Sequence, residues 1–518
     1  MEAAPTILPD LDALDTEALK VLVREQHTQL LSHEAEIAHL KLLLAKLQRQ
    51  QFGRKSERME RQIEQLEQRL EDLETSQAER LSAQKPETVA AVTAPRRPVR
   101  KPLPAHLPRE TKVYAPPDET CPSCGGALRP LGEDVSEVLE YLPARFYVIR
   151  HVRPKLSCGG CQHIVQAPAP SRPIERGLAG PGLLAHVLAA KYCDHAPLYR
   201  QSEMYARSGV ELERSTLADW VGGANRLLAP LVEALRRYVM AAGKLHADDT
   251  PVPVLAPGQG QTKTGRLWTY VRDDRPAGDS AAPAVWFAYS PDRKGEHPQR
   301  HLETFRGTLQ ADAYAGFNQL YQSGRIQEAA CWAHVRRKLY DLQQAQASPL
   351  ATEAVKRIGE LYEIEREIRG RLPDERKQIR QARARPILEA LHTWLAASYG
   401  KLSRKSDVAQ AMHYALSRWT ALIRYCEDGR IEIDNNAAER ALRVVALGRK
   451  NFLFAGSDRG GERAASLYSL LGSAKLNGVE PEAYLREVLT RIADYPVNRI
   501  SELLPWSLVP SSPPSSER

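Results

Sequence analysis

Apolar residues near the start of the chain recur at three- and four-residue intervals, which is the pattern of a coiled-coil helix. One run consists of Leu30, Ile37, Leu40, Leu44 and Leu47, and a second of Ile63, Leu66, Leu70 and Leu73. The two runs are out of register, and Phe52-Gly53 lies between them. The pattern therefore predicts two helices joined by a basic corner within residues 1–80. They form either an arm for self-association or a helical hairpin within one chain.

Residues 81–118 have the composition of an extended linker. Eight prolines between Lys85 and Pro117 are interleaved with basic residues such as Arg97 and Arg109. Proline lacks a backbone N–H and the like charges repel, so this segment is not expected to build a core. We predict a linker that either follows DNA phosphates or serves as a solvated spacer.

Two Cys-x-x-Cys pairs follow, separated by 33 residues. Their members are Cys121, Cys124, Cys158 and Cys161. Tight turns that each aim two thiolates at one point suit a tetrahedral Zn²⁺ site with four sulfur ligands. Between the pairs, residues 135–152 have the pattern of strands and can form a hairpin. We predict a structural zinc module over residues 119–170, the alternative being two unrelated dithiols.

Residues 171–240 are strongly helical in pattern. One helix is expected to end at Gly209 and the next to be capped by Ser215, which is the outline of a helix-turn-helix. Such an outline is common among helical hairpins. The segment is therefore either a DNA reader or a platform that packs on the following domain.

Beyond residue 240 the pattern changes to strands separated by turn residues. The expected strands are 244–255, 265–273, 284–289, 307–312 and 326–330, with helices at 297–305 and from Gly316. The resulting order, β-β-β-α-β-α-β, is that of a ribonuclease-H-like fold. We place the first part of this catalytic core at residues 241–335.

In that fold the first and fourth strands are neighbours, so acids at their ends share one edge of the sheet. Asp248 or Asp249 occupies the first position and Asp312 the second. Glu439 is the candidate for a third acid, on a helix that Asp434 or Asn435 can cap. Converging carboxylates recruit two Mg²⁺ or Mn²⁺ ions, which together favour in-line displacement at phosphorus.

Basic residues surround these acids in the sequence. The candidates for DNA contacts are Arg440, Arg443, Arg449, Lys450, Arg336 and Arg337. The stretch from Arg440 to Gly461 is predicted to be turn-rich, with a glycine loop that suits a DNA backbone. As the alternative, the cations are an ordinary solvated helix face and the glycines an ordinary loop.

Between Asp312 and Glu439 lie 126 residues of mainly helical pattern. We interpret residues 336–430 as a helical insertion, 431–465 as the second part of the catalytic core and 466–518 as a small helical C-terminal region. The predicted fold class is thus multidomain α+β, with a coiled coil, a zinc module, a helix-turn-helix-like region, and a ribonuclease-H-like domain interrupted by helices.

Overall composition agrees with a polyanion partner. The net charge is +8, yet residues 1–80 carry 11 basic against 16 acidic residues, so +13 falls on the remaining 438. No apolar run approaches the length of a membrane span, and the N-terminus lacks a secretion signal. We expect a cytoplasmic protein without a membrane partner.

The ordered motifs of this chain resemble those of the insertion sequence 66 family of bacterial DDE transposases over nearly the whole length. They include Phe52-Gly-Arg-Lys-Ser-Glu57, both cysteine pairs, Lys191-Tyr, His195-Ala-Pro-Leu-Tyr-Arg-Gln201, His246-Ala-Asp-Asp-Thr250, Asp312-Ala-Tyr-Ala-Gly316, Asp434-Asn-Asn-Ala-Ala-Glu-Arg440, Gly448 to Ser457 and Leu476 to Pro481. The family's first acid usually begins an Asp-Glu-Thr triplet, which selects Asp248. This chain has Asp249 in place of the glutamate, so the choice between the neighbours stays open.

The resemblance implies a metal-dependent enzyme that cuts DNA at the element's inverted terminal repeats and joins the ends to target DNA. It also implies homo-oligomers, two small companion proteins from the same element, and association with the nucleoid when bound to DNA. Two alternatives are a non-catalytic, zinc-containing DNA-binding regulator and a nuclease without joining activity. The sequence retains all the candidate acids and zinc cysteines, so decay of the element is not visible.

Overall fold

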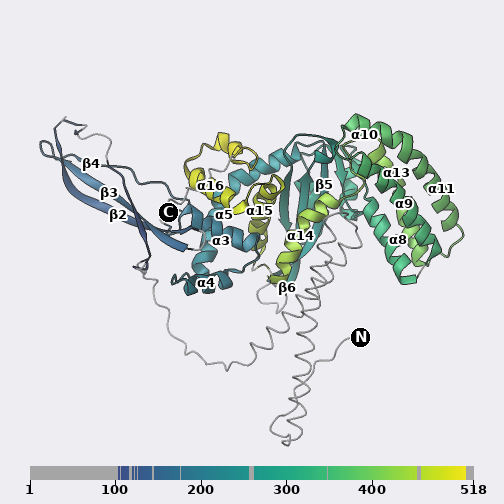
Figure 1. Ribbon diagram of the computed structural model, residues 1–518, viewed down its shortest axis with the longest axis horizontal. Helices are drawn as coiled ribbons and strands as arrows, with labels where there is room; N and C mark the ends of the chain where they lie inside the picture. Colours follow the sequence, from purple (N-terminus) through teal and green to yellow (C-terminus); the bar gives the residue numbers. More distant parts are fainter. Residues whose placement is uncertain are drawn as a thin grey trace, which may run out of the picture. The chain divides into compact units, whose positions relative to one another are not determined.

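The computed structural model describes most of the chain after residue 102 (Figure 1). The described residues are 103–105, 107–115, 120–121, 123–124, 126–142, 145–174, 177–255, 262–346, 348–451, 455 and 457–508. The predicted coiled-coil arm at residues 1–80 and most of the predicted linker lie outside them. None of the helices in the described part combines the length and apolar character that a membrane span needs.

A small sheet carries the four paired cysteines. Its strands are β1 (Arg109–Val113), β2 (Leu128–Leu142), β3 (Arg145–Cys158) and β4 (Ile164–Gln166). Strands β2 and β3 form the long antiparallel hairpin that the sequence predicts between the cysteine pairs. Strands β1 and β4 both pair with β3 on the side away from β2, β1 with residues 148–152 and β4 with residues 155–157.

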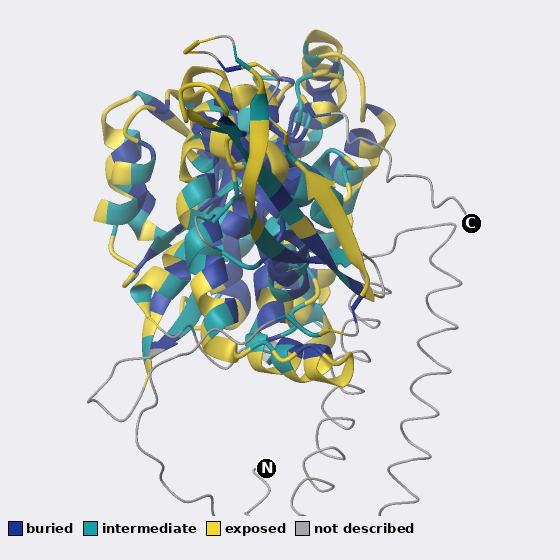
Figure 2. Ribbon diagram, turned by 90° about the vertical axis from the view of Figure 1, so that its left-hand side faces the viewer, coloured by how far each residue is buried: buried dark blue, intermediate teal, exposed yellow. Residues whose placement is uncertain are grey.

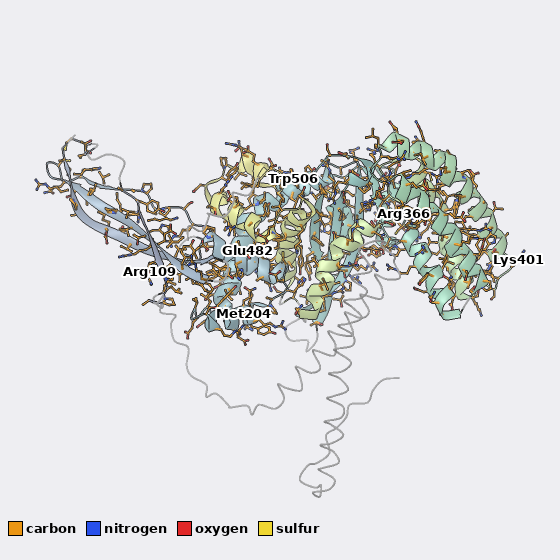
Figure 3. All side chains as sticks on the ribbon, viewed as in Figure 1. Arg109, Met204, Arg366, Lys401, Glu482 and Trp506 are labelled. Carbon is orange, nitrogen blue, oxygen red and sulfur yellow. The ribbon has the colours of Figure 1, made fainter. Side chains whose placement is uncertain are left out.

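Strand β1 corrects the prediction that the linker is extended and unpacked as far as residue 118. Residues 109–113 pair in parallel with β3, and Leu107 is buried in the main core. The guanidinium of Arg109, labelled in Figure 3, donates to the carbonyls of Leu103, Pro104, Ala105 and Leu107 and to the Glu137 carboxylate. Backbone pairing and a single buried leucine thus order the end of a segment whose proline content predicted otherwise.

Three helices connect this sheet to the next domain. They are α3 (Pro181–Tyr192), α4 (Leu198–Arg207) and α5 (Arg214–Met240). Gly209 has a φ of +78°, a left-handed conformation that suits a chain reversal after α4. Ser215 does not cap α5, which already begins at Arg214. One face of α5 is buried from Leu217 to Val239, so this helix is packed as a platform.

The central sheet has five strands in the order β7-β6-β5-β8-β9. Their bounds are β5 Lys244–Leu255, β6 Thr262–Arg272, β7 Ala284–Ser290, β8 Gly307–Gln310 and β9 Ile326–Ala329. Strands β5, β6 and β7 are antiparallel neighbours, whereas β8 is parallel to both β5 and β9. Helices α6 (Glu296–His301) and α7 (Asn318–Gln322) connect β7, β8 and β9. The predicted β-β-β-α-β-α-β order is therefore confirmed.

Helix α15 (Asp458–Leu476) covers the edge strand β7 and satisfies its free backbone donors. The N–H groups of Val285 and Phe287 donate to the hydroxyls of Ser473 and Ser469, both of which are buried. An edge strand otherwise exposes a row of unpaired donors. The sheet, α5, α15 and α16 (Pro481–Arg491) share one hydrophobic core, which lies beneath the exposed outer residues in Figure 2.

The residues between β9 and the last candidate acid form a helical bundle with a core of its own, on which Figure 3 labels Arg366 and Lys401. Its helices are α8 (Trp332–Gln346), α9 (Pro349–Glu367), α10 (Pro373–Ile379), α11 (Arg385–Tyr399), α12 (Asp407–Ser417) and α13 (Trp419–Ile423), with a π-helical turn at Arg380–Ala384. Helices α8 and α15 run across residues 335 and 465, so the expected boundaries there fall inside helices.

Two buried arginines fasten this bundle to the segment that returns to the sheet. Arg376 donates to the Gly429 carbonyl and pairs with Glu432 at 2.9 Å, and it also contacts Glu365. Arg380 pairs with Glu365 at 2.7 Å and donates to the Tyr425 carbonyl. Buried guanidinium groups need such acidic partners, because an unpaired buried charge is strongly destabilising.

Candidate active site

The pairing of β5 with β8 brings two of the predicted acids to one edge of the sheet. The last pair in this parallel ladder is His246 with Gln310. Asp248 and Asp312 each follow two residues beyond that pair, Asp248 within β5 and Asp312 in the turn after β8. The Asp312 carboxylate accepts from the N–H of Tyr314 at 3.2 Å, which fixes it at the start of this turn.

Two buried amide side chains attach the segment that carries Glu439 to the same strands. Gln310 donates to the carbonyls of Glu432 and Asp434 at 2.7 and 3.2 Å and accepts from the N–H of Glu432 at 2.9 Å. Asn435 donates to the Ala247 carbonyl at 2.8 Å. Helix α14 (Asn436–Asn451) begins at this point and contacts β5, so Glu439 in its first turn faces the sheet edge.

Of the two residues predicted to cap α14, Asp434 takes the role. Its carboxylate accepts from the backbone N–H of Asn436 at 3.1 Å and from that residue's side-chain amide. The side chain of Asn435 contacts β5 instead: its amide nitrogen donates to the Ala247 carbonyl, and its amide oxygen lies 3.1 Å from Nδ1 of His246. The helix start is therefore fixed both by its own cap and by the strand.

The negative charges of both Asp312 and Glu439 act on Asp248. Burial, together with the negative charges of Asp312, Asp249 and Glu439, raises the pKa of Asp248 to about 7. Burial likewise raises the pKa of Asp312, and the charge of Asp249 adds to that effect. The charges that act on the Asp248 carboxylate are thus those of other acids, which is the environment that a bound cation would relieve.

The environments of the two neighbouring aspartates differ sharply. The Asp249 side chain is only 1% exposed and pairs with Arg266 at 2.9 Å and with Arg293 at 2.8 Å. Asp248 has no ion-pair partner among the described residues, and its carboxylate accepts only from the N–H of Asp249, at 2.7 Å. Asp249 is thus neutralised by arginines, whereas the charge of Asp248 remains available to a cation.

Glu439 lies against helix α8. Its two carboxylate oxygens lie 3.4 Å from Nη2 of Arg337 and 3.7 Å from Nε2 of His334. One oxygen, Oε1, is buried without a hydrogen bond in the described structure. A buried carboxylate oxygen without a donor, beside the uncompensated charge of Asp248, fits the hard oxygen ligands that Mg²⁺ and Mn²⁺ prefer.

The predicted DNA-contact residues lie around this edge. Arg440 and Arg443 are exposed on α14, and Arg337 is exposed on α8. Arg449 is half-buried and donates to the Pro251 carbonyl at 3.1 Å, while Arg336 lies 6.0 Å from the Tyr340 ring centre. The side chain of Lys450 lies outside the described residues.

The prediction that the stretch after Glu439 is rich in turns is wrong for most of its length. Helix α14 continues to Asn451, and α15 begins at Asp458, where the Ser457 hydroxyl caps it by accepting from Gly460. Gly461 lies inside α15, and glycine is needed at this position because a side chain there would overlap the ring of Tyr289. The absence of a side chain at Gly461 therefore permits close packing of α15 on the sheet.

The four paired cysteines converge as predicted. Their sulfur atoms all lie within 4.8 Å of one another, and three of the pairs are 3.2 to 3.3 Å apart. Tetrahedral zinc with Zn–S bonds of about 2.3 Å places sulfurs about 3.8 Å apart, so a small outward movement accommodates the ion. The donor set contains four sulfurs and leaves no open position, which is the composition of a structural site.

The backbone of each turn supports this cluster. The N–H groups of Cys161 and Gly160 lower the pKa of the Cys158 thiol to about 6, which favours the thiolate form that binds metal. A side chain at Gly126 would approach the Cys158 sulfur to 3.2 Å, so glycine keeps that space open. The N–H of Cys121 donates to the Gly126 carbonyl at 2.8 Å and closes the first turn.

Several residues that shape the site were not predicted from the sequence. Gln310, Arg266 and Arg293 were not singled out, and Asn435 was considered only as a cap. Their partners lie far away in the chain: Gln310 and Glu432 are 122 positions apart. The only local signal was a polar glutamine at the end of a short, otherwise buried strand.

Comparison with known proteins agrees with this arrangement. The family model described as "Transposase IS66 family" matches residues 176–463. Those described as the zinc-finger binding domain of transposase IS66, the homeodomain of transposase C of IS166, and the IS66 C-terminal element match residues 118–162, 39–111 and 469–506.

Three similar proteins come from Sinorhizobium fredii. The chain is 45% identical to uncharacterized protein y4hP over 91% of its own length and 88% of the relative, and 40% identical to y4qI over 93% and 91%. It is 39% identical to y4jD over 78% and 81%. The chain therefore belongs to the IS66 transposase family, with a zinc-binding domain before its DDE transposase domain.

Proposed function

We propose that this protein is a DDE transposase that cleaves DNA at the inverted terminal repeats of its element and transfers the ends to target DNA. The proposal is supported by the positions of Asp248 and Asp312 two residues beyond the last paired residues of β5 and β8, and by the charge of Glu439 in the first turn of α14, which acts on Asp248. The strand order β7-β6-β5-β8-β9, with β8 parallel to β5, supports a ribonuclease-H-like fold for this domain.

Asp248, Asp312 and Glu439 would hold two divalent cations, in keeping with the lack of positive charge around Asp248 and the unbonded oxygen of Glu439. Bound Mg²⁺ or Mn²⁺ supplies Lewis acidity for activating water or a 3′-hydroxyl and for stabilising the leaving oxygen. Asp249 is the less suitable first ligand because Arg266 and Arg293 already bind its carboxylate.

The residues around the acids have distinct roles in this proposal. Arg293 joins Asp249 to the second acid, since its guanidinium lies 3.8 Å from the Asp312 carboxylate. Arg337 and His334 orient Glu439 from α8. Arg440 and Arg443, exposed on α14, lie on the helix that presents Glu439 and would bind the phosphates of the DNA end.

The remaining modules serve assembly and localisation. Strand transfer requires two element ends held together, which gives the proposed N-terminal coiled coil a role in forming homo-oligomers. The two companion proteins of the element are proposed partners. Since the DNA substrate lies in the bacterial cytoplasm, the protein acts there, bound to the nucleoid.

The test is strand transfer by the purified full chain on a labelled duplex that ends in the terminal repeat, with Mn²⁺. We expect Asp312→Asn to reduce cleavage and joining by about 10³-fold, because one metal ligand supplies several kcal/mol of transition-state stabilisation, while DNA affinity changes less than twofold. Asp279→Asn, in an exposed turn beyond β6, is the matched control and should retain activity.

The same assay separates the alternatives. DNA binding without cleavage by the wild-type protein, with any divalent metal, would support a non-catalytic regulator. Cleavage without joined products would support a nuclease. Asp248→Asn should abolish both steps, whereas Asp249→Asn should chiefly destabilise the fold, because it leaves two arginines without their buried acid. Full loss of activity in a stable Asp249→Asn protein would make Asp249 the first ligand instead.

A further inference from the structure

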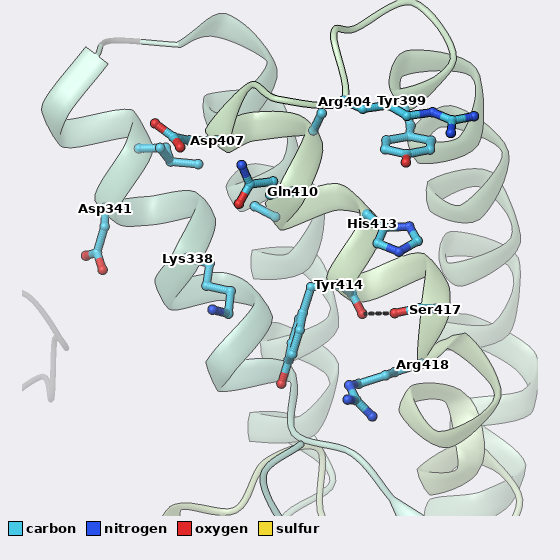
Figure 4. A pocket seen from close by; sticks show the side chains of 13 residues that line it. Lys338, Asp341, Tyr399, Arg404, Asp407, Gln410, His413, Tyr414, Ser417 and Arg418 are labelled. Atoms are coloured by element: carbon cyan, nitrogen blue, oxygen red, sulfur yellow. Dashed lines mark hydrogen bonds between the residues drawn. The ribbon is translucent and has the colours of Figure 1, made fainter. Parts of the chain in front are cut away.

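A cavity of about 570 Å³ opens on the helical insertion between α8, α11 and α12. Its lining residues lie between Asp312 and Glu439 in the sequence. Figure 4 shows the side chains that line it. They include Lys338, Tyr399, Arg404, His413, Tyr414 and Arg418. We call it the insertion cavity. Its volume lies within the range of about 300–1,000 Å³ that is usual for sites of small molecules and nucleotides.

The cationic side chains of the insertion cavity are only partly neutralised. Lys338 and Arg404 have no acidic side chain within ion-pair distance among the described residues, although Asp341 and Asp407 also line the opening. Arg418 lies 3.6 Å from the Glu328 carboxylate, and its Nε atom is buried without a hydrogen bond. These cations favour an anionic ligand, such as a phosphate group.

Aromatic rings alternate with these cations. The Lys338 ammonium lies 5.0 Å from the centre of the Tyr414 ring, and the Arg418 guanidinium lies 5.4 Å from it. The rings of Tyr399 and His413 are stacked, with centres 5.6 Å apart and planes inclined by 20°. Aromatic faces beside phosphate-binding cations are the combination that proteins use for unpaired nucleotides, where the base stacks and the backbone is neutralised.

Two walls of the cavity extend to the candidate acids. Helix α8 contacts Glu439 through His334 and Arg337, and Lys338 follows directly on the same helix. On the other wall, Nη2 of Arg418 lies 3.5 Å from the carbonyl of Ala313, the residue after Asp312. A DNA strand whose phosphate lies at the acids therefore has cavity residues within reach of its neighbouring nucleotides.

We propose that the insertion cavity binds an unpaired nucleotide adjacent to the phosphate at which the acids act. This inference rests on the proposed transposase activity and identifies single-stranded DNA at the element end as the ligand. Lys338 and Arg404 bind its phosphates, and Tyr414 offers a ring for its base. A paired base is a poor ligand, because its faces are covered by stacked neighbours and unstacking costs a few kcal/mol.

The test compares two DNA ligands that differ only in pairing. One is a blunt terminal-repeat duplex, and the other carries four unpaired thymidines at its 3′ end. Fluorescence anisotropy measures the affinity of the full chain in an Asp312→Asn background, which prevents turnover. Lys338→Gln with Arg404→Gln should weaken binding of the tailed duplex about tenfold and that of the blunt duplex less than twofold. The control, Lys356→Gln with Lys377→Gln, removes the same charge from exposed positions on α9 and α10 and should change neither.

A second pair of variants tests the aromatic ring. Tyr414→Phe keeps the ring and should retain binding of the tailed duplex, whereas Tyr414→Leu should weaken it severalfold with unchanged circular dichroism. A 5-iodouracil in the tail should crosslink on irradiation to the peptide that contains His413 and Tyr414. A crosslink only outside the insertion, or equal loss for both duplexes, overturns the inference.

The outcomes also distinguish this inference from the proposed function. If Asp312→Asn abolishes joining but the Lys338 and Arg404 variant binds the tailed duplex normally, the cavity assignment fails and the transposase assignment stands. If the wild-type protein neither binds nor cleaves terminal-repeat DNA, both fail. Selective loss of tailed-duplex binding in a protein that cleaves normally at saturating DNA supports both.

Discussion

Replacing Gln310 tests whether one buried amide aligns the acids. Its side chain is fully buried at the end of β8 and makes three hydrogen bonds to the backbone of residues 432 and 434. These bonds span the gap between the strand that leads to Asp312 and the helix that carries Glu439. We expect Gln310→Leu to damage both stability and activity.

The size of the effect follows from these contacts. Leucine fills a similar volume, so the loss is mainly electrostatic: two carbonyls and one N–H lose their partner. Each buried backbone group without a partner costs about 1–3 kcal/mol, and rehydration at the site edge recovers part of this. We therefore expect a loss of about 3 kcal/mol in the free energy of unfolding. A shift of the third acid by about 1 Å would reduce catalysis about 10²-fold.

Urea unfolding and the initial rate of DNA end cleavage, both measured well below the melting temperature, check this prediction. Gln310→Glu is the second variant: it keeps an acceptor for the Glu432 N–H but replaces the donor that two carbonyls require. Gln327→Leu, an exposed glutamine on the adjacent strand β9, is the matched control and should change little. Wild-type cleavage by a stable Gln310→Leu protein would refute the role of this amide in aligning the acids.

Two further predictions concern the zinc site and pH. Cys124→Ser should lower zinc affinity by more than about 100-fold and make the β2–β3 hairpin sensitive to protease, whereas Cys193→Ser should keep one zinc per chain by elemental analysis. Burial lowers the pKa of His301 from 6.5 to about 3. Below pH 6.5 this histidine is therefore protonated in the unfolded chain but stays neutral in the folded chain, so the free energy of unfolding falls as the pH drops. Between pH 7 and pH 5 the free energy of unfolding should fall by about 2 kcal/mol because of His301. The variant His301→Phe should lose this contribution to the pH dependence of stability in urea titrations. An unchanged slope would contradict it.

The strands of the five-stranded central sheet could be predicted closely because their signals are local. The first strand is Lys244–Leu255 as expected, and the others deviate by no more than a few residues at their ends. Once the strand order was known, the parallel pairing of β5 with β8 followed, and with it the common edge for Asp248 and Asp312. The zinc cysteines were predictable for the same reason, since each pair lies within one turn.

The errors arose where long-range packing overrides local pattern. Prolines and charges around Arg109 predicted an open linker, but pairing with β3 makes a strand of it. Glycines 460 and 461 predicted a loop, but both lie in α15, and the ring of Tyr289 leaves no room for a side chain at Gly461. Neither partner is visible from the local sequence, because residues 289 and 461 meet only after the sheet has formed.

The position of the insertion has a consequence for the third acid. The segment from Gly429 to Asn435 is held on one side by the insertion, through Arg376, and on the other by the sheet, through Gln310. Glu432 is common to both, since its carboxylate pairs with Arg376 while its backbone bonds to Gln310. Any rotation of the insertion against the sheet must therefore strain this segment and move the start of α14, where Glu439 lies. A nucleotide that binds in the insertion cavity and favours one orientation of the helices would thereby favour one position of that acid. Under the proposed function, an insertion before the last acid would link DNA binding to the alignment of the three candidate acids, a link that an insertion elsewhere in the sheet would not provide.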